Sequence, residues 1–169
     1  MSMYNEKQPK PEQDVPIGNL YESLHNQLGT LVDYNDSIIF INDDITEHTL
    51  TDEMFAIIDY IESLDVKVNT ICRGKAFSAA AIILACGTGS RMMSKRSTVM
   101  LHQSSSFLGG KMSDITAYLD NVRNLESSIY KILAEKTNKD EKYWKAQMKS
   151  DMYLTADKAK ELGVIDEII

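Results

Sequence analysis

The chain is short of cysteine and of long apolar runs. Two cysteines, Cys72 and Cys86, occur among its 169 residues. This number excludes a disulfide framework and suits a reducing compartment. The longest uninterrupted apolar run extends from Ala79 to Cys86, far below the ~18 residues that a membrane-spanning helix needs. Because residues 1–16 contain no apolar signal core, we expect a cytoplasmic protein that is neither secreted nor membrane-bound.

Proline is confined to the first 16 residues, at Pro9, Pro11 and Pro16. This polar segment is predicted to be a flexible N-terminal arm, since it cannot bury enough apolar surface to become ordered. With 18 basic and 25 acidic residues the net charge is −7. An acidic surface repels phosphate backbones, so a nucleic-acid partner is not expected. The remaining residues, 17–169, suffice for a single domain with a substantial core.

Metal and nucleotide sites have no support in the sequence. None of the three histidines, His25, His48 and His102, pairs with cysteine or carboxylate at the spacing of metal ligands. The segment 87–89 contains two glycines but does not connect a strand to a helix, which argues against a dinucleotide-binding loop. We therefore expect neither a metal nor a cofactor in this protein.

Apolar periodicity predicts that strands and helices alternate. Strands are expected at 37–42, 66–72, 98–101 and 164–169, where short apolar runs are bounded by polar residues. Helices are expected at 20–31, from Thr51 to Leu64, at 76–86, at 114–137 after a Ser113 cap, and at 156–162 between a Thr155 cap and Gly163. This alternation predicts an α/β fold with a largely parallel sheet.

The stretch most informative for chemistry is Gly74-Lys-Ala-Phe-Ser-Ala-Ala80. It places Ser78 at the start of an apolar helix, where free backbone N–H groups favour developing negative charge. A nucleophilic serine benefits from this position because acyl transfer passes through an oxyanion. On this fragment alone, a helix-capping serine is the more common explanation. His102 follows strand 98–101 and, taken alone, is more often a solvated histidine than a base.

Read together, these segments resemble the Clp protease proteolytic subunit (ClpP) family. Residues 70–81 (TICRGKAFSAAA) are similar to its nucleophile segment, and 100–103 (MLHQ) to its catalytic-histidine strand. Residues 150–159 and 163–168 resemble the segment with the acidic residue and the closing helix and strand. Residues 37–42 and the helix from Met54 are similar to its first strand and an early helix. The resemblance covers roughly residues 18–169.

The resemblance implies an α/β fold of the ClpP/crotonase type, a spiral of βαβ units with a long protruding helix. It also implies a serine-type endopeptidase in which Ser78 is the nucleophile, His102 the general base and Asp151 the group that orients the imidazole. The backbone N–H of Ala79 is expected to be one oxyanion donor. Asp151 is preferred to three neighbouring aspartates because it directly precedes the segment Met-Tyr-Leu-Thr-Ala.

Two features depart from the family pattern. In the family a proline usually follows His-Gln, whereas this chain has Ser104 at that position. The segment that contains it, with Gln103 and the glycine pair 109–110, lies where the family has its substrate-flanking segment. In addition, a strand and a glycine-rich turn that complete the oxyanion hole are missing near residues 50–54. Either the protein lacks this segment or the sequence omits a stretch of the natural chain. The good register on both sides favours the omission.

The resemblance further implies self-assembly into heptameric rings that are stacked as a tetradecamer through the long helix 114–137. The expected partners are an AAA+ unfoldase such as a Clp ATPase, which alone uses ATP, and unfolded polypeptide substrates. An alternative is a catalytically impaired structural or regulatory ring subunit, which the missing glycine turn favours. An acyl-CoA hydratase-like enzyme is disfavoured by His102-Gln103 after a strand, and a Ser–Lys signal-peptide peptidase by the lack of a membrane anchor.

Overall fold

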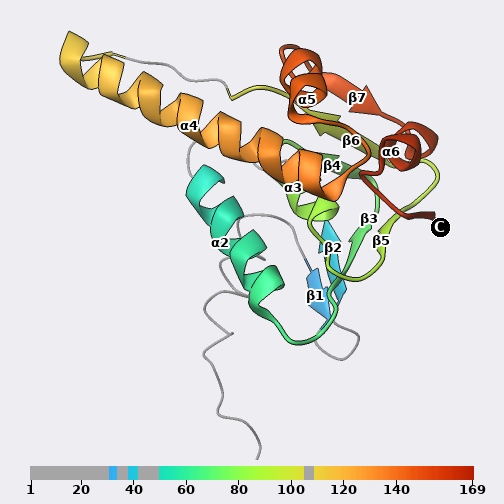
Figure 1. The fold of residues 1–169 in the computed structure, drawn as a ribbon. Helices are drawn as coiled ribbons and strands as arrows, with labels where there is room; N and C mark the ends of the chain where they lie inside the picture. Colours follow the sequence, from blue (N-terminus) through green and yellow to red (C-terminus); the bar gives the residue numbers. More distant parts are fainter. Residues whose placement is uncertain (1–30, 34–37, 42–49, 105–108) are drawn as a thin grey trace, which may run out of the picture.

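Strands and helices alternate along the residues that this computed structural model describes, 31–33, 38–41, 50–104 and 109–169 (Figure 1). The strands are β1 (Leu31–Asp33), β2 (Ile38–Ile41), β3 (Asn69–Cys72), β4 (Lys75–Phe77), β5 (Arg91–Met93), β6 (Thr98–Leu101), β7 (Met152–Leu154) and β8 (Glu167–Ile168). The helices are α2 (Leu50–Ser63), α3 (Ala79–Ala85), α4 (Met112–Lys136), α5 (Glu141–Gln147) and α6 (Ala156–Leu162).

The strands form two sheets of mixed direction. The five-stranded sheet has the order β1-β2-β3-β5-β8 and is parallel except for the β1–β2 pair. The three-stranded sheet has the order β4-β6-β7, with β4 parallel and β7 antiparallel to the central strand. Strand β2 pairs directly with β3, so these two strands are neighbours in the first sheet.

Helix α3 lies at the centre of the core. All seven of its residues are buried, and it packs against β3, β4, β6, α2 and α4. The small side chains of Ala79, Ala80 and Ala81 allow such close approach on every side. The largest fully buried side chains include Trp144 and Leu133, which come from the helices that follow.

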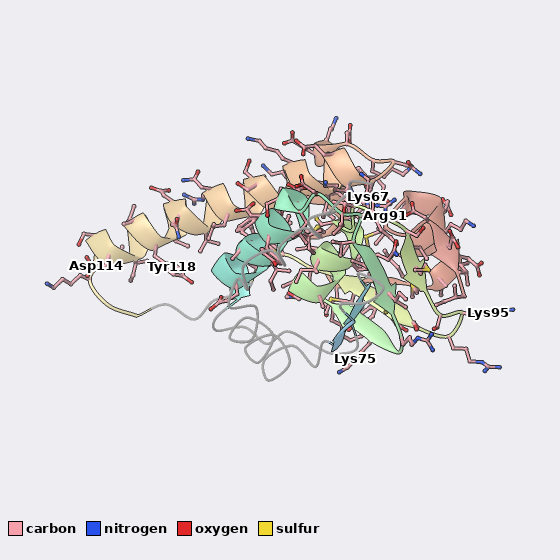
Figure 2. All side chains as sticks on the ribbon, turned by 90° about the horizontal axis from the view of Figure 1, so that it is seen from below. Lys67, Lys75, Arg91, Lys95, Asp114 and Tyr118 are labelled. Atoms are coloured by element: carbon pink, nitrogen blue, oxygen red, sulfur yellow. The ribbon has the colours of Figure 1, made fainter. Side chains whose placement is uncertain are left out.

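Arg91, which is labelled in Figure 2, joins three chain segments through its side chain. Its guanidinium donates to Ala85 O over 3.2 Å and to Lys136 O over 2.7 Å, at the ends of α3 and α4. It also holds both carboxylate oxygens of Asp166, at 2.5 and 3.0 Å. The guanidinium of Arg91 keeps the pKa of Asp166 below its ordinary value. One side chain thus ties α3 and α4 to the segment before β8.

Long helix α4 is packed along only part of its length. Its buried residues are Ile129, Tyr130 and Leu133, whereas the half that contains Asp114 and Tyr118 projects from the rest of the molecule (Figures 1 and 2). Apolar side chains remain exposed there, with Met112 76% and Leu119 39% accessible. A protruding helix was expected from the family resemblance.

Several expected boundaries are confirmed. Strand β6 occupies the expected residues 98–101, and β2 lies inside the expected range 37–42. Helix α6 begins after Thr155, whose side chain accepts a hydrogen bond from the backbone N–H of Lys158, and ends at Gly163 in the left-handed conformation, φ 77°. Within the described ranges, no helix has the length and apolar character needed to cross a bilayer.

Other expectations were wrong in detail. The helix expected from Ala76 begins at Ala79, because residues 75–77 pair with β6 and form β4. Helix α2 starts one residue before Thr51, and α4 starts at Met112, so Ser113 lies inside the helix. Strand β3 begins at Asn69, later than expected, and β8 is confined to two residues. Strands β5 and β7 and helix α5 were not expected from periodicity.

The start of the chain is only partly covered by the described residues. The proposed arm 1–16 and residues 20–30 of the first expected helix lie outside them. The last residue of that helix, Leu31, begins strand β1.

Candidate active site

Ser78 lies where strand β4 meets helix α3. Its backbone N–H donates to Met100 O over 2.8 Å, which extends the hydrogen bonding between β4 and β6 by one residue. Its carbonyl accepts the backbone N–H of Ala81 over 3.0 Å and so begins the helix. Ser78 is therefore fixed through its backbone at both sides, while the residue itself is half-buried.

The conformation of Ser78 is unusual for a residue with a side chain. Its φ is 56° and its ψ −124°, and it has the one positive φ found among non-glycine residues in the described segments. Such a sharp strand-to-helix turn directs the hydroxyl outward from the turn. Although Ser78 occupies the N-cap position, its side chain makes no capping hydrogen bond. The hydroxyl is not used to cap α3, which weakens the purely structural explanation.

The register of the three-stranded sheet brings the other two candidate residues toward Ser78. The β4–β6 ladder ends at Phe77↔Met100, so the next residue along β6 after this pair is Leu101, followed by His102. The β6–β7 ladder ends at Leu101↔Met152, and the residues just beyond it are His102 and Asp151. Directly opposed residues of antiparallel strands lie about 5 Å apart between Cα atoms. One end of this sheet therefore collects all three.

The three side chains are not joined in this structure. Within the described residues, no hydrogen bond or ion pair links Ser78, His102 and Asp151. His102 is half-buried and Asp151 is exposed. Catalytic hydrogen bonds are often long or poorly aligned before substrate binds. The structure therefore offers a shared sheet end and not a formed triad.

The backbone N–H of Ala79 is available as an oxyanion donor. Ala79 is the first residue of α3, and the first N–H groups of a helix have no partner inside it. In the described part of the chain, no acceptor for this N–H is found. A second donor from the expected glycine turn has no counterpart in the sequence near residues 50–54.

Two further nucleophiles can be set aside. Burial raises the pKa of the Cys72 thiol to about 11 and that of the Cys86 thiol to about 12. Because the thiolate is the reactive form, this burial argues against either cysteine as a nucleophile at neutral pH. The residues that the structure describes also contain no group of three or more His, Cys, Asp or Glu side chains that could hold a metal ion.

Two sets of contacts around the candidate site were not predicted from the sequence. The rings of Phe77 and Tyr153 meet edge to face with centroids 5.9 Å apart, across the middle strand. Glu126 of α4 accepts hydrogen bonds from Gln103 and Ser104. Glu126 shares a helix face with the buried apolar residues of α4. A glutamate on an apolar face is the sequence signal that could have revealed its contacts with Gln103 and Ser104.

The family-model match covers residues most of which the structure describes. The family model described as Clp protease matches residues 49–169. The chain is 37% identical over 115 residues to "ATP-dependent Clp protease proteolytic subunit 2" of Frankia casuarinae, covering 68% of this chain and 53% of that protein. It is 36% identical over 118 residues to "ATP-dependent Clp protease proteolytic subunit 1" of Bifidobacterium longum, covering 69% and 51%. The chain thus spans about half the length of these relatives.

Proposed function

The chain belongs to the Clp protease family, which confirms the family predicted from its motifs, and we propose that it is a serine endopeptidase subunit with Ser78, His102 and Asp151 as its triad. The observation that carries the proposal is the meeting of β4, β6 and β7 at one sheet end, where one of these residues directly adjoins the end of each strand. The hydroxyl of Ser78 makes no capping hydrogen bond and lies on a turn with φ 56°, which supports the nucleophile assignment.

The proposed chemistry follows from these roles. His102 takes the proton from Ser78 Oγ as this oxygen attacks the carbonyl carbon of a peptide bond. The tetrahedral oxyanion accepts a hydrogen bond from the backbone N–H of Ala79. His102 then gives its proton to the leaving amine, and water releases the acyl group by the reverse sequence. Asp151 holds the imidazole in the correct tautomer and stabilises its positive charge.

A catalytically impaired ring subunit is the second candidate. The missing glycine turn near residues 50–54 favours it, because loss of one oxyanion donor lowers turnover about 10²–10³-fold. The mass calculated from the sequence is 19.1 kDa. A heavier intact protein would identify an omitted segment, whereas a protein of 19.1 kDa would mean that the turn is absent from the chain.

The decisive test is labelling with a fluorophosphonate probe, followed by intact mass measurement. We expect one adduct on the unmodified protein and none on the Ser78→Ala variant, which should retain its assembly state. The Asp151→Asn variant should lose about 10⁴-fold in peptide turnover, because the imidazole would adopt the wrong tautomer. A protein that takes no label would overturn the peptidase proposal and favour the impaired subunit. A small effect of Asp151→Asn would assign its role to another aspartate.

The names of the two relatives suggest which substrates and partners this chain has. The two relatives are named as subunits of ATP-dependent proteases, so we propose unfolded polypeptides as substrates and an AAA+ unfoldase as the partner that uses ATP. Seven-membered rings, stacked as a tetradecamer through the projecting half of α4, form the proposed chamber. The exposed apolar side chains of Met112 and Leu119 support a contact in this region.

A further inference from the structure

Helix α4 carries a carboxylate on the face that it turns toward the core. Glu126 precedes Ile129, Tyr130 and Leu133 by three, four and seven residues, and these are the buried residues of the helix. Side chains at such spacings share one helix face. Half-buried Glu126 thus places a charge where an apolar residue is expected. A carboxylate in such a position needs hydrogen-bond donors, because its partial removal from water otherwise costs free energy.

The donors come from the two residues that follow His102. Gln103 Nε2 donates to Glu126 Oε2 over 3.1 Å, and the backbone N–H of Ser104 donates to Glu126 Oε1 over 3.2 Å. The backbone N–H of Gln103 also donates to Met148 O over 2.6 Å. The chain that leaves β6 is therefore held on one side by α4 and on the other by the C-terminal end of α5.

The contact with Ser104 depends on the residue type at that position. Proline has no backbone N–H, so a proline at position 104 would leave Glu126 Oε1 without this donor. Serine supplies the N–H, and α4 supplies the matching carboxylate. We infer that Glu126 is a positioning residue of the proposed peptidase, fixing through Gln103 and Ser104 the backbone that carries His102. This inference rests on the proposed function of the chain.

The expected consequence is a change in the chemical step. A general base must stay within hydrogen-bond reach of the proton that it removes, and a displacement of about 1 Å can lower a rate on the order of 10²-fold. Loss of the Glu126 contacts frees the chain directly after His102. The rate at which Ser78 reacts should therefore fall, while the core of the protein, which packs on Ile129, Tyr130 and Leu133 in the following turns of α4, should keep its stability.

The test measures kcat and KM on a fluorogenic peptide, the rate of fluorophosphonate labelling and the thermal midpoint. Glu126→Ala should lower kcat and the labelling rate about tenfold or more, within the range given by such displacements, with a smaller change in KM. Glu126→Gln should restore most of the rate, because its amide can still pair with Ser104 N–H and with a flipped Gln103 side chain. Glu135→Ala, an exposed glutamate on the same helix, is the matched control and should have no effect.

A second pair of variants keeps the inference testable should Glu126→Ala disturb folding or assembly. Ser104→Ala retains the backbone N–H and should match the unmodified protein, whereas Ser104→Pro removes it and should slow labelling. Ser104→Pro should add little to Glu126→Ala, since both break the same contact. Equal rates for Ser104→Ala and Ser104→Pro, or an unaffected Glu126→Ala, would overturn the inference alone. An unmodified protein that takes no label would overturn the proposed function as well.

Discussion

At the scale of single residues, Ser78 combines a strained backbone with a hydroxyl that makes no capping hydrogen bond. Non-glycine residues with such φ and ψ values cost of the order of 1–3 kcal/mol and persist where the surrounding structure fixes them. Here the fixing groups are Met100 O, which accepts from Ser78 N–H, and the first turn of α3. This backbone conformation keeps the Ser78 hydroxyl out of a capping hydrogen bond. The hydroxyl thus remains available for the proposed role of nucleophile.

This strain predicts that Ser78→Gly stabilises the protein. Glycine adopts positive φ without a Cβ clash but loses about 0.5–1 kcal/mol more conformational entropy on folding. The net gain is expected to be about 1 kcal/mol, because the relief is the larger of the two effects. Ser78→Ala keeps the Cβ and is the matched control. Scanning calorimetry should give a higher midpoint for Ser78→Gly than for Ser78→Ala, and equal midpoints would argue against strain at this turn.

At the scale of elements, the sequence predicted what depends on local pattern. Strand β6 and helix α6 follow from their own residues, and Thr155 and Gly163 mark the ends of α6 as predicted. Strand β4 could not be predicted in this way, because Ala76 continues an apolar helical pattern. The segment around Ala76 forms a strand only because it pairs with β6, where Ala76 lies opposite Val99. Such a pairing between distant segments leaves no periodic signal in the sequence of either one.

In the candidate site, too, local sequence pattern predicted some features, whereas contacts between distant segments could not be predicted. Ser78 and His102 could be predicted because short motifs around them resemble a known family, and Asp151 because of the segment that follows it. The Glu126 contacts join residues that lie far apart in the chain, and the edge-to-face contact of Phe77 with Tyr153 spans a whole strand. These features depend on the angle at which α4 and β7 reach the site, which local pattern does not determine.

The junction at Arg91 predicts a large effect of a conservative substitution. Arg91→Lys cannot serve Asp166, Ala85 O and Lys136 O together, since lysine lacks the planar fork of arginine. Loss of hydrogen bonds from a charged donor to these carbonyls should lower the free energy of unfolding by about 2 kcal/mol at pH 7. Arg123→Lys, in an exposed pair with Asp120, is the control and should change it by about 0.5 kcal/mol at most.

The same substitution has a defined pH dependence. Because Arg91 lowers the pKa of folded Asp166, this carboxylate contributes stability above its unfolded pKa of about 3.9 and loses it as pH falls through the folded value. The difference between the unmodified protein and Arg91→Lys, measured by urea titration, should therefore shrink as the pH falls below about 4. A difference that is constant between pH 7 and pH 3 would mean that the carbonyl contacts alone matter.

At the scale of the whole molecule, the projecting half of α4 is the part that the described fold leaves least covered. The buried residues of the helix lie in its C-terminal half, while Met112, Tyr118 and Leu119 are exposed. Exposed apolar side chains gathered on one element are typical of a contact surface. In the proposed assembly this surface joins two rings, and its removal should separate them without unfolding the subunit.

Leu119→Asp tests this arrangement directly. A carboxylate on the apolar face should prevent burial against a second ring, because an unpaired charge in an apolar contact is strongly unfavourable. Native mass spectrometry should then find single heptameric rings in place of the tetradecamer. Asn121→Asp adds the same charge on another face of the helix and should leave the tetradecamer intact. The thermal midpoint of the subunit should remain near that of the unmodified protein, since Leu119 is 39% exposed. A stable tetradecamer in the Leu119→Asp variant would show that α4 does not join the rings through this face.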